Sequence, residues 1–145
     1  MGSLNVAAGS LVYLDSVAVI YSMEKFPEYW PRLRPLWERS ARREITLCSS
    51  ELTLLETLVG PIKHGNAALA DEYERLLSKT EFRPLPITPP VLTAAARLRV
   101  ESGLKTPDAI HAATALLAKC DAFVTNDSAF TRVAQLPTSL IGTWT

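Results

Sequence analysis

The stretch Leu104–Asp127, LKTPDAIHAATALLAKCDAFVTND, decides the fold of this chain. Its first half predicts a helix, because Thr106 can cap the helix start with its hydroxyl and Pro107 suits the first helical position. The helix body, Ala109–Ala118, consists mostly of alanine and leucine and has almost no polar side chain to face water. A helix of this composition is expected inside a domain rather than on its surface.

A short buried strand, Ala122–Val124, is predicted directly after this helix. The same stretch carries a carboxylate near each end, at Asp108 and Asp127. Carboxylate oxygens are the ligands that Mg²⁺ and Mn²⁺ prefer, so buried elements that bring acids to one end of a sheet indicate a metal site. This interpretation requires further acids from the rest of the chain.

The length of 145 residues and a hydrophobic content of 48 % predict one domain with a substantial core. We interpret residues 1–10 as an N-terminal extension, in part a cloning remnant, and residues 11–145 as the domain. No apolar run is long enough to cross a membrane and no signal peptide is visible, which predicts a cytoplasmic protein. Cys48 and Cys120 form no metal-ligand spacing, and we expect both to be buried, reduced thiols.

The formal charge is zero, with 15 basic and 15 acidic residues, which excludes a protein that holds nucleic acid by bulk charge. An RNA-binding role would need a local basic face or bound cations. The helix predicted within Phe26–Arg43 offers such a face, although Pro31 and Pro35 disturb its start. A solvated face is the favoured interpretation and RNA contact is the alternative. The arginines of this face are Arg32, Arg34, Arg39, Arg42 and Arg43.

Strands and helices alternate along the rest of the chain. Further strands are predicted at Leu11–Leu14, Ile45–Cys48, Phe82–Ile87 and Ser139–Ile141. Helices are predicted at Val17–Met23, Glu51–Val59 with a stop at Gly60–Pro61, Asn66–Ser78, between Thr88 and Gly103, and at Ser128–Ala134. This alternation predicts an α/β fold with a parallel sheet covered on both faces. In such folds the site lies beyond the carboxyl ends of the strands.

Two further acids lie where they can reach that edge. Asp15 directly follows the first predicted strand. Glu56 lies in the middle of a predicted helix, on the face that carries Leu52 and Val59, where a buried carboxylate without a cation would cost on the order of a few kcal/mol. Glu51 lies in the first turn of the same helix, where the helix dipole favours an acid, so it needs no further explanation.

Each acid also has an ordinary structural interpretation. Asp15, Asp108 and Asp127 could each serve a helix start, and Asp127 could make a turn. Four acids directed to one sheet edge, with no competing cluster of Cys and His, favour a site for Mg²⁺ or Mn²⁺. His111 lies about one helical turn after Asp108, and a hydrogen-bonded core histidine is favoured over one that contacts metal-bound water or phosphate.

Four motifs of the chain resemble those of the PIN domain family, in particular those of VapC-type toxins from bacterial toxin–antitoxin pairs. The motifs are VYLDSVAVIY, SSELTLLETLVGP, LKTPDAIHAATALLA and FVTND, and they extend over residues 12–127. The resemblance implies a three-layer α/β/α sandwich with a mainly parallel central sheet. It also implies that Asp15, Glu56, Asp108 and Asp127 are the catalytic acids and the metal ligands.

The resemblance extends to residues beside these acids. Thr125 matches a hydroxyl position beside the last acid, and Ser16 keeps a hydroxyl beside the first. Val17 stands where the family often has an amide, a departure that concerns the surroundings of the ligands rather than the ligands themselves.

The function that the resemblance implies is a metal-dependent endoribonuclease, the toxin of a type II toxin–antitoxin module. Such a toxin hydrolyses RNA with water activated by Mg²⁺ or Mn²⁺, is neutralised by a cognate antitoxin protein, and is expected to form a homodimer. Two alternatives remain open: a PIN nuclease of RNA maturation without an antitoxin, and a non-catalytic PIN module that binds RNA or protein. The non-catalytic module would lack acids, and all four are present in the sequence.

Overall fold

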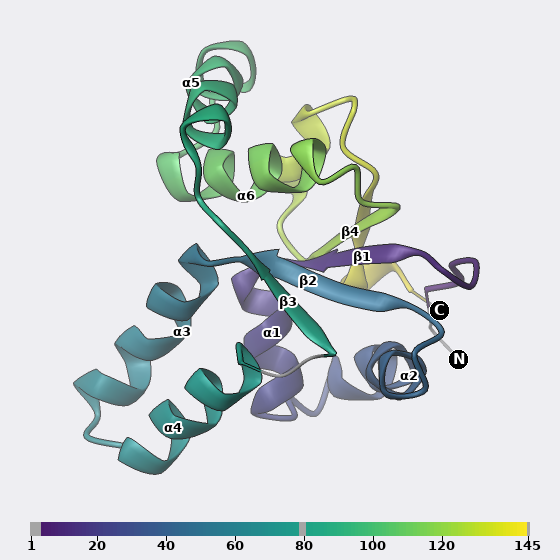
Figure 1. Ribbon diagram of the computed structural model, residues 1–145, viewed down its shortest axis with the longest axis vertical. Helices are drawn as coiled ribbons and strands as arrows, with labels where there is room; N and C mark the ends of the chain where they lie inside the picture. The colour runs from purple at the N-terminus through teal and green to yellow at the C-terminus, as the bar shows by residue number, and fades with distance from the viewer. Residues whose placement is uncertain (1–3, 79–80, 145) are drawn as a thin grey trace.

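Five strands form one parallel sheet in the computed structural model, which describes residues 4–78 and 81–144 (Figure 1). Their order across the sheet is β3-β2-β1-β4-β5. The strands are β1 (Leu11–Leu14), β2 (Thr46–Ser50), β3 (Phe82–Leu85), β4 (Ala122–Thr125) and β5 (Thr138–Leu140). The α-helices are α1 (Ser16–Met23), α2 (Trp30–Ala41), α3 (Leu52–Lys63), α4 (Ala67–Leu76), α5 (Pro89–Ser102) and α6 (Thr106–Leu117). The short 3₁₀ helices are η1 (Ser128–Arg132) and η2 (Ile141–Thr143).

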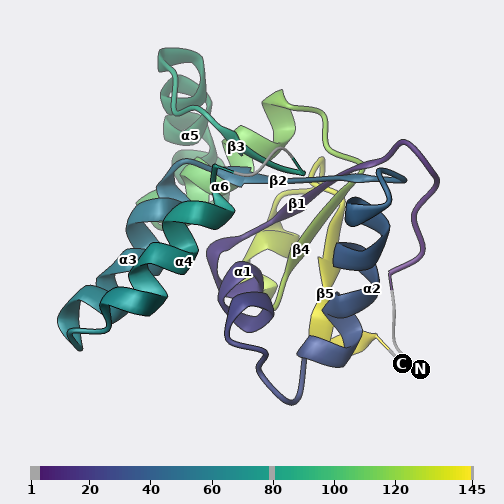
Figure 2. The same cartoon turned by 60° about the horizontal axis from the view of Figure 1, so that its bottom comes forward.

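Each face of the sheet has its own hydrophobic core, so the molecule has three layers (Figure 2). Helices α1, α2 and α4 pack on one face, against side chains that include Val12 and Leu14. Helices α5 and α6 pack on the other face, against Tyr13 and Phe123. Neighbouring residues of one strand serve opposite cores because side chains alternate along a strand. The predicted α/β/α sandwich is confirmed.

The strand order reverses between β1 and β4. Strands β2 and β3 lie on one side of β1, and β4 and β5 lie on the other. β1 and β4 pair in parallel, with Leu14 opposite Val124 at their carboxyl ends. A reversal of this kind leaves a crevice beyond the two central strands, and α/β proteins bind ligands there. The fold therefore places the candidate site where β1 and β4 end. We call this place, where the strand order reverses, the switch point of the sheet.

Helix α6 is buried as its composition predicts. Its alanines Ala109, Ala112 and Ala113 have no exposed surface. The predicted cap is wrong: Lys105 occupies the N-cap position, Thr106 is the first helical residue, and no side chain caps this helix. Lys105 itself gives the reason, because its side chain has no oxygen that could accept an N–H of the first turn.

Helix α3 continues through the predicted stop at Gly60–Pro61 and ends at Lys63. Gly60 has no Cβ to meet the proline ring, and Pro61 lies in the last turn, so the helix tolerates both residues. The stop is instead Gly65, whose φ of +67° is left-handed. The N–H of the following Asn66 donates to the Pro61 carbonyl at 2.8 Å, which closes the helix end.

The edge strand and the two cysteines agree with their predictions. β3 lies at one edge of the sheet, the place that Pro84 suits. Cys48 and Cys120 are buried and free of any disulfide. In residues 4–78 and 81–144, no helix has both the length and the apolar character needed to cross a membrane.

The N-terminal residues lie partly inside the described structure. Of the predicted extension, residues 1–10, the first three lie outside the described residues. Leu4 and Val6 pack against the core that contains α1, α2 and α4. The Gly9 N–H donates to the Glu44 carbonyl at 2.7 Å. Residues 4–10 thus contact the domain.

The arginines of α2 and the residues after it are mostly engaged within the chain. Arg32 donates to the Ile141 carbonyl at 2.9 Å, and Arg34 pairs with Glu38 at 3.1 Å. Arg39 and Arg42 both pair with Glu44, at 3.2 Å and 3.0 Å. These pairs fit the favoured interpretation of a solvated, self-paired face rather than an RNA contact.

Candidate metal centre

Asp15 directly follows β1 and is 4 % exposed. Its Oδ1 accepts the Ala18 N–H at 2.9 Å and so caps α1, and its Oδ2 accepts the Thr125 hydroxyl at 2.5 Å. Burial raises the pKa of the Asp15 carboxyl from 3.8 to about 6, against these hydrogen bonds, which lower it. Asp15 therefore caps a helix, as the ordinary interpretation has it, and is also a buried acid at the switch point.

Thr125 connects the acids of the two central strands. It is the last residue of β4, is fully buried, and donates to Asp15 while its Oγ1 accepts the Asp127 N–H at 3.0 Å. Asp127 is exposed, and its Oδ1 accepts the Ala129 N–H at 2.9 Å at the start of η1. Ser16 is the first residue of α1, and among the described residues no hydrogen bond joins its hydroxyl to an acid.

Asp108 is the acid that interacts electrostatically with each of the other three. It lies in the first turn of α6 and is partly exposed. Burial first, and then the charges of Asp127 and Glu56, raise the pKa of its carboxyl above the usual value. The charge of Asp108 in turn raises the pKa of Asp15. Asp108 therefore repels each of the other three acids, which come from three other segments of the chain, at one edge of the sheet.

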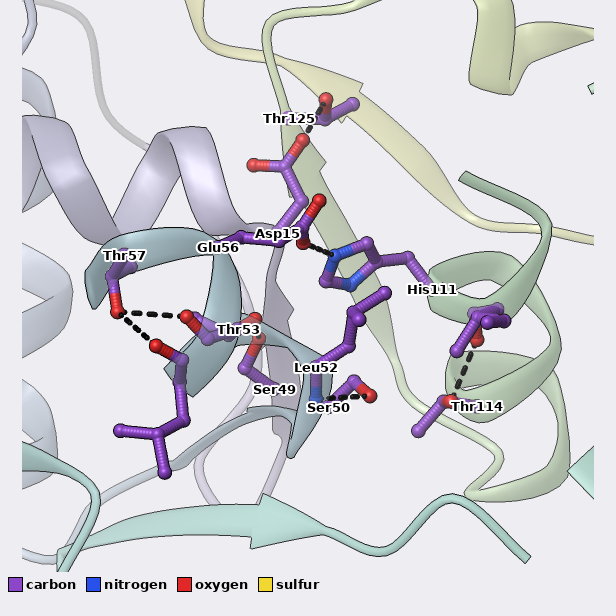
Figure 3. A network of polar contacts seen from close by, with 12 residues as sticks. Asp15, Ser49, Ser50, Leu52, Thr53, Glu56, Thr57, His111, Thr114 and Thr125 are labelled. Atoms are coloured by element: carbon purple, nitrogen blue, oxygen red, sulfur yellow. Dashed lines mark hydrogen bonds and ion pairs between the residues drawn. The ribbon is translucent and has the colours of Figure 1, made fainter. Parts of the chain in front are cut away.

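Glu56 reaches this edge from α3, but not in the way that the sequence predicts. The expectation that it lies on a buried apolar face is wrong, because Val59 is 56 % exposed and the buried residues of α3 are Thr53, Thr57 and Pro61. The side chain of Glu56 is 25 % exposed, and its Oε1 lies 2.6 Å from the Nε2 of His111 (Figure 3). A hydrogen-bond partner, rather than burial, defines the position of this acid.

His111 contacts Glu56 from the buried side of the site, and Tyr13 contacts His111. His111 is 2 % exposed, and its Nδ1 lies 2.7 Å from the Tyr13 hydroxyl. The favoured interpretation of His111 as a hydrogen-bonded core residue is confirmed. Burial raises the pKa of Tyr13 well above its usual value of 10, so the hydroxyl keeps its proton. Tyr13 is not among the site residues that the sequence predicts, although a tyrosine in an otherwise apolar strand indicates a buried hydroxyl with a partner.

The four acids offer the type of donor atom that a divalent cation prefers, but they do not form a complete cage for one. In residues 4–78 and 81–144, no three Asp, Glu, His or Cys side chains lie close enough together to form a ready metal cage. The donors are carboxylate oxygens, the type that Mg²⁺ and Mn²⁺ prefer, and Asp15 and Asp108 both show the raised pKa that a nearby cation would reverse. A bound cation would therefore stabilise the ionised carboxylates of this acidic centre.

The fold and the site together define a class of protein: parallel α/β/α sandwiches with acids at the switch point of the sheet. Within that class, the family model that describes the PIN domain matches residues 12–136 of the chain. This chain belongs to the PIN domain family, and the family is one of nucleases. No curated protein sequence matches it.

Solved structures with the same fold cover nearly the whole chain. One, VapBC2 from Rickettsia felis bound to a DNA fragment from its promoter, superimposes with a TM-score of 0.73 at 18 % identity, over 93 % of this chain and 99 % of the other. A toxin–antitoxin complex from Klebsiella pneumoniae gives 0.61 at 22 % identity, over 90 % and 97 %. VapBC-1 from nontypeable Haemophilus influenzae gives 0.65 at 19 % identity, over 91 % and 98 %. At these identities the likeness concerns the fold.

Proposed function

We propose that this protein is an endoribonuclease that uses Mg²⁺ or Mn²⁺, and that it is the toxin of a toxin–antitoxin pair. The observation that carries the proposal is a set of acids at the switch point of a PIN domain, in which burial raises the pKa of Asp15 and Asp108 and the charges of Asp127 and Glu56 raise that of Asp108 further. PIN nucleases typically use divalent metal ions. The proposed ligands are Asp15, Glu56, Asp108 and Asp127.

Hydrogen bonds orient two of the proposed ligands, Asp15 and Glu56. Hydrogen bonds from Thr125 and from the Ala18 N–H fix both oxygens of Asp15. His111 fixes one oxygen of Glu56. Asp127 is exposed, and so is the acid most open to an incoming RNA. A bound divalent ion supplies an acidified water and screens the charge of the phosphate. No nucleophile from the protein is required.

A protein partner accounts for exposed apolar side chains on α3. Leu55, Val59 and Ile62 are 61 %, 56 % and 68 % exposed, and their spacing of four and three residues puts them on one side of the helix. A row of this kind is typical of an interaction surface. The solved structure from Klebsiella pneumoniae is a toxin–antitoxin complex. We therefore include a cognate antitoxin and a homodimer in the proposal.

The nuclease part is tested with purified protein and RNA of mixed structure. We expect cleavage with Mg²⁺ or Mn²⁺, loss of cleavage in EDTA, and its return when excess metal is added. Asp15→Asn, which keeps an oxygen to cap α1, should fold and fail to cleave. Full activity in chelator, or full activity of Asp15→Asn, would contradict the metal mechanism.

The toxin part is tested in living bacteria. Expression of the wild type should arrest growth, expression of Asp15→Asn should not, and a small protein encoded beside the gene should relieve the arrest. Growth that continues despite active nuclease in the cell lysate would favour the alternative of an RNA maturation enzyme.

A further inference from the structure

A chain of hydrogen bonds runs from the backbone of β2 to the Glu56 carboxylate. The Ser50 N–H donates to the Tyr13 hydroxyl oxygen at 3.0 Å, and this oxygen lies 2.7 Å from the His111 Nδ1. The Nε2 of the same ring lies 2.6 Å from the Glu56 Oε1. Figure 3 shows the His111 ring directed from α6 toward Glu56 on α3. Tyr13 is fully buried and His111 is 2 % exposed, so water does not compete for these bonds.

One placement of protons satisfies every member of this chain. An ionised carboxylate only accepts, so the His111 Nε2 carries a hydrogen and donates it to Glu56. The Nδ1 of a neutral ring is then an acceptor. The Ser50 N–H and the Ser49 side chain both hydrogen-bond to the Tyr13 oxygen in the sense that lowers its pKa, that is, as donors, so the tyrosine proton is directed to the imidazole Nδ1 at 2.7 Å. Tyr13 thereby selects one tautomer of His111.

We propose that Tyr13 and His111 are positioning residues that hold the Glu56 carboxylate for a metal ion. His111 occupies Oε1, and Oε2 accepts no hydrogen bond from the described residues, so one oxygen is held and the other is free to bind a cation. This inference rests on the proposed metal site. The partners of a metal ligand generally matter almost as much as the ligand, with losses of 10- to 100-fold in affinity when they are removed.

Packing alone does not explain the Tyr13 hydroxyl. The ring stacks on Phe123, with centroids 4.9 Å apart and planes 12° apart, and a phenylalanine could make the same contact. A buried hydroxyl costs free energy unless it is paired. The hydroxyl instead fixes a histidine whose other nitrogen holds an acid, and this arrangement specifies where that acid points.

The hydrogen-bond chain is testable without metal or RNA. The protein has two histidines, and His64 is exposed at the end of α3, so ¹⁵N NMR of the ring nitrogens compares His111 with a free histidine in one sample. We expect His111 in the single tautomer with hydrogen on Nε2, and a mixture at His64. Tyr13→Phe should turn the His111 signal into a mixture.

Tyr73→Phe is the matched control for this measurement. Tyr73 is also a fully buried tyrosine, and its hydroxyl donates to a glutamate, Glu24, at 2.6 Å in the other core. Its removal should leave the His111 tautomer unchanged. A His111 signal that is the same in wild type and Tyr13→Phe would overturn the inference about the hydrogen-bond chain.

Metal binding tests what the chain does for Glu56. Calorimetric titration with Mn²⁺ should show affinity lowered about 10- to 100-fold in His111→Ala, lowered less in Tyr13→Phe, and unchanged in Tyr73→Phe. His111→Gln can place an amide N–H near the position of Nε2 and should recover part of the affinity. Thermal melts of each variant identify losses that come from unfolding.

The outcomes separate this inference from the proposed function. If the wild type binds Mn²⁺ and cleaves RNA while Tyr13→Phe and His111→Ala bind Mn²⁺ equally well, the positioning role is wrong and the nuclease stands. If the wild type binds no Mn²⁺, the metal site is wrong and the positioning role fails with it, even where NMR shows the hydrogen bonds. Weakened binding in both variants, with partial recovery in His111→Gln, supports the inference.

Discussion

Two glutamates of the α3 region differ in what surrounds them. Glu56 contacts a buried histidine, whereas Glu51 is exposed at the N-cap of α3 and accepts the Ile87 N–H at 3.3 Å. We predict that Glu56→Gln abolishes RNA cleavage and weakens Mn²⁺ binding with the fold intact, because the amide removes the charge that a cation needs. Glu51→Gln should keep nearly full cleavage and lose well under ~1 kcal/mol of stability, because it loses only a favourable dipole interaction.

Cleavage assays, Mn²⁺ titration and urea denaturation on both variants check this prediction. The two substitutions are chemically identical, one at the N-cap of α3 and one within it, so each is the control for the other. If Glu51→Gln is the inactive variant, the placement of α3 against the sheet edge is wrong.

The raised pKa of Asp15 predicts a pH dependence of stability in metal-free protein. Its carboxyl has a pKa of about 6 in the fold against 3.8 ordinarily, so the folded state binds the proton more tightly than the unfolded state does. This contribution is fully present below about pH 4, is lost as the pH rises to about 6, and stays lost above it. At about 1.4 kcal/mol per pKa unit, the loss in free energy of unfolding is ~3 kcal/mol.

Urea denaturation in EDTA between pH 4 and 7 measures this effect. Asp15→Asn cannot titrate at this position and should lack this part of the pH dependence, so the difference between the two proteins should grow as the pH rises. Two parallel curves would show that Asp15 titrates equally in the folded and unfolded states.

At the scale of elements, the end of α3 depends on Gly65. Its φ of +67° is strained for an L-residue with a Cβ. We predict that Gly65→Ala lowers the free energy of unfolding by about 1 kcal/mol, while Gly65→Asn loses less because asparagine tolerates this conformation better. Chemical denaturation of both variants checks the order. Equal losses would indicate that something other than backbone conformation acts at this position.

Helix α6 and strand β4 show which element features are readable in a sequence. The alanine-rich body of α6 and the short apolar run of β4 predict burial directly, because they have almost no polar side chain to face water. The end of α3 differs from its prediction because Gly60 and Pro61 disfavour a helix separately but are tolerated together near its end. Rules for single residues treat Gly60 and Pro61 separately, whereas the stability of the helix end depends on the two residues together.

At the scale of the whole molecule, we predict self-association. The row of Leu55, Val59 and Ile62 on α3 is exposed in the single chain, and its coverage by a second copy or an antitoxin would remove apolar surface from water. Light scattering at high micromolar concentration should show a dimer, and Val59→Lys should weaken it by placing a charge on that row. A strict monomer at that concentration would contradict the homodimer.

The fold class and the identity of the candidate acids could be predicted from the sequence. The alternation of strands and helices determines a covered parallel sheet, and acids directly after strands must lie at its carboxyl edge. Asp15 after β1 and Asp127 after β4 follow from chain order alone. These features are local, since a residue's distance from the end of its own strand is set by covalent connection.

The partners of those acids were decided only by the tertiary structure. Tyr13 and His111 are 98 residues apart, as their hydrogen bond records, and Asp15 and Thr125 are 110 apart. No local pattern specifies such contacts, because they depend on strand order, helix packing and side-chain direction together. The position of Glu56 shows the same limit: its helical face predicts an apolar burial, while the structure holds it through a histidine of another helix. Sequence determines which groups approach the edge, and packing across the sheet determines which groups they bond.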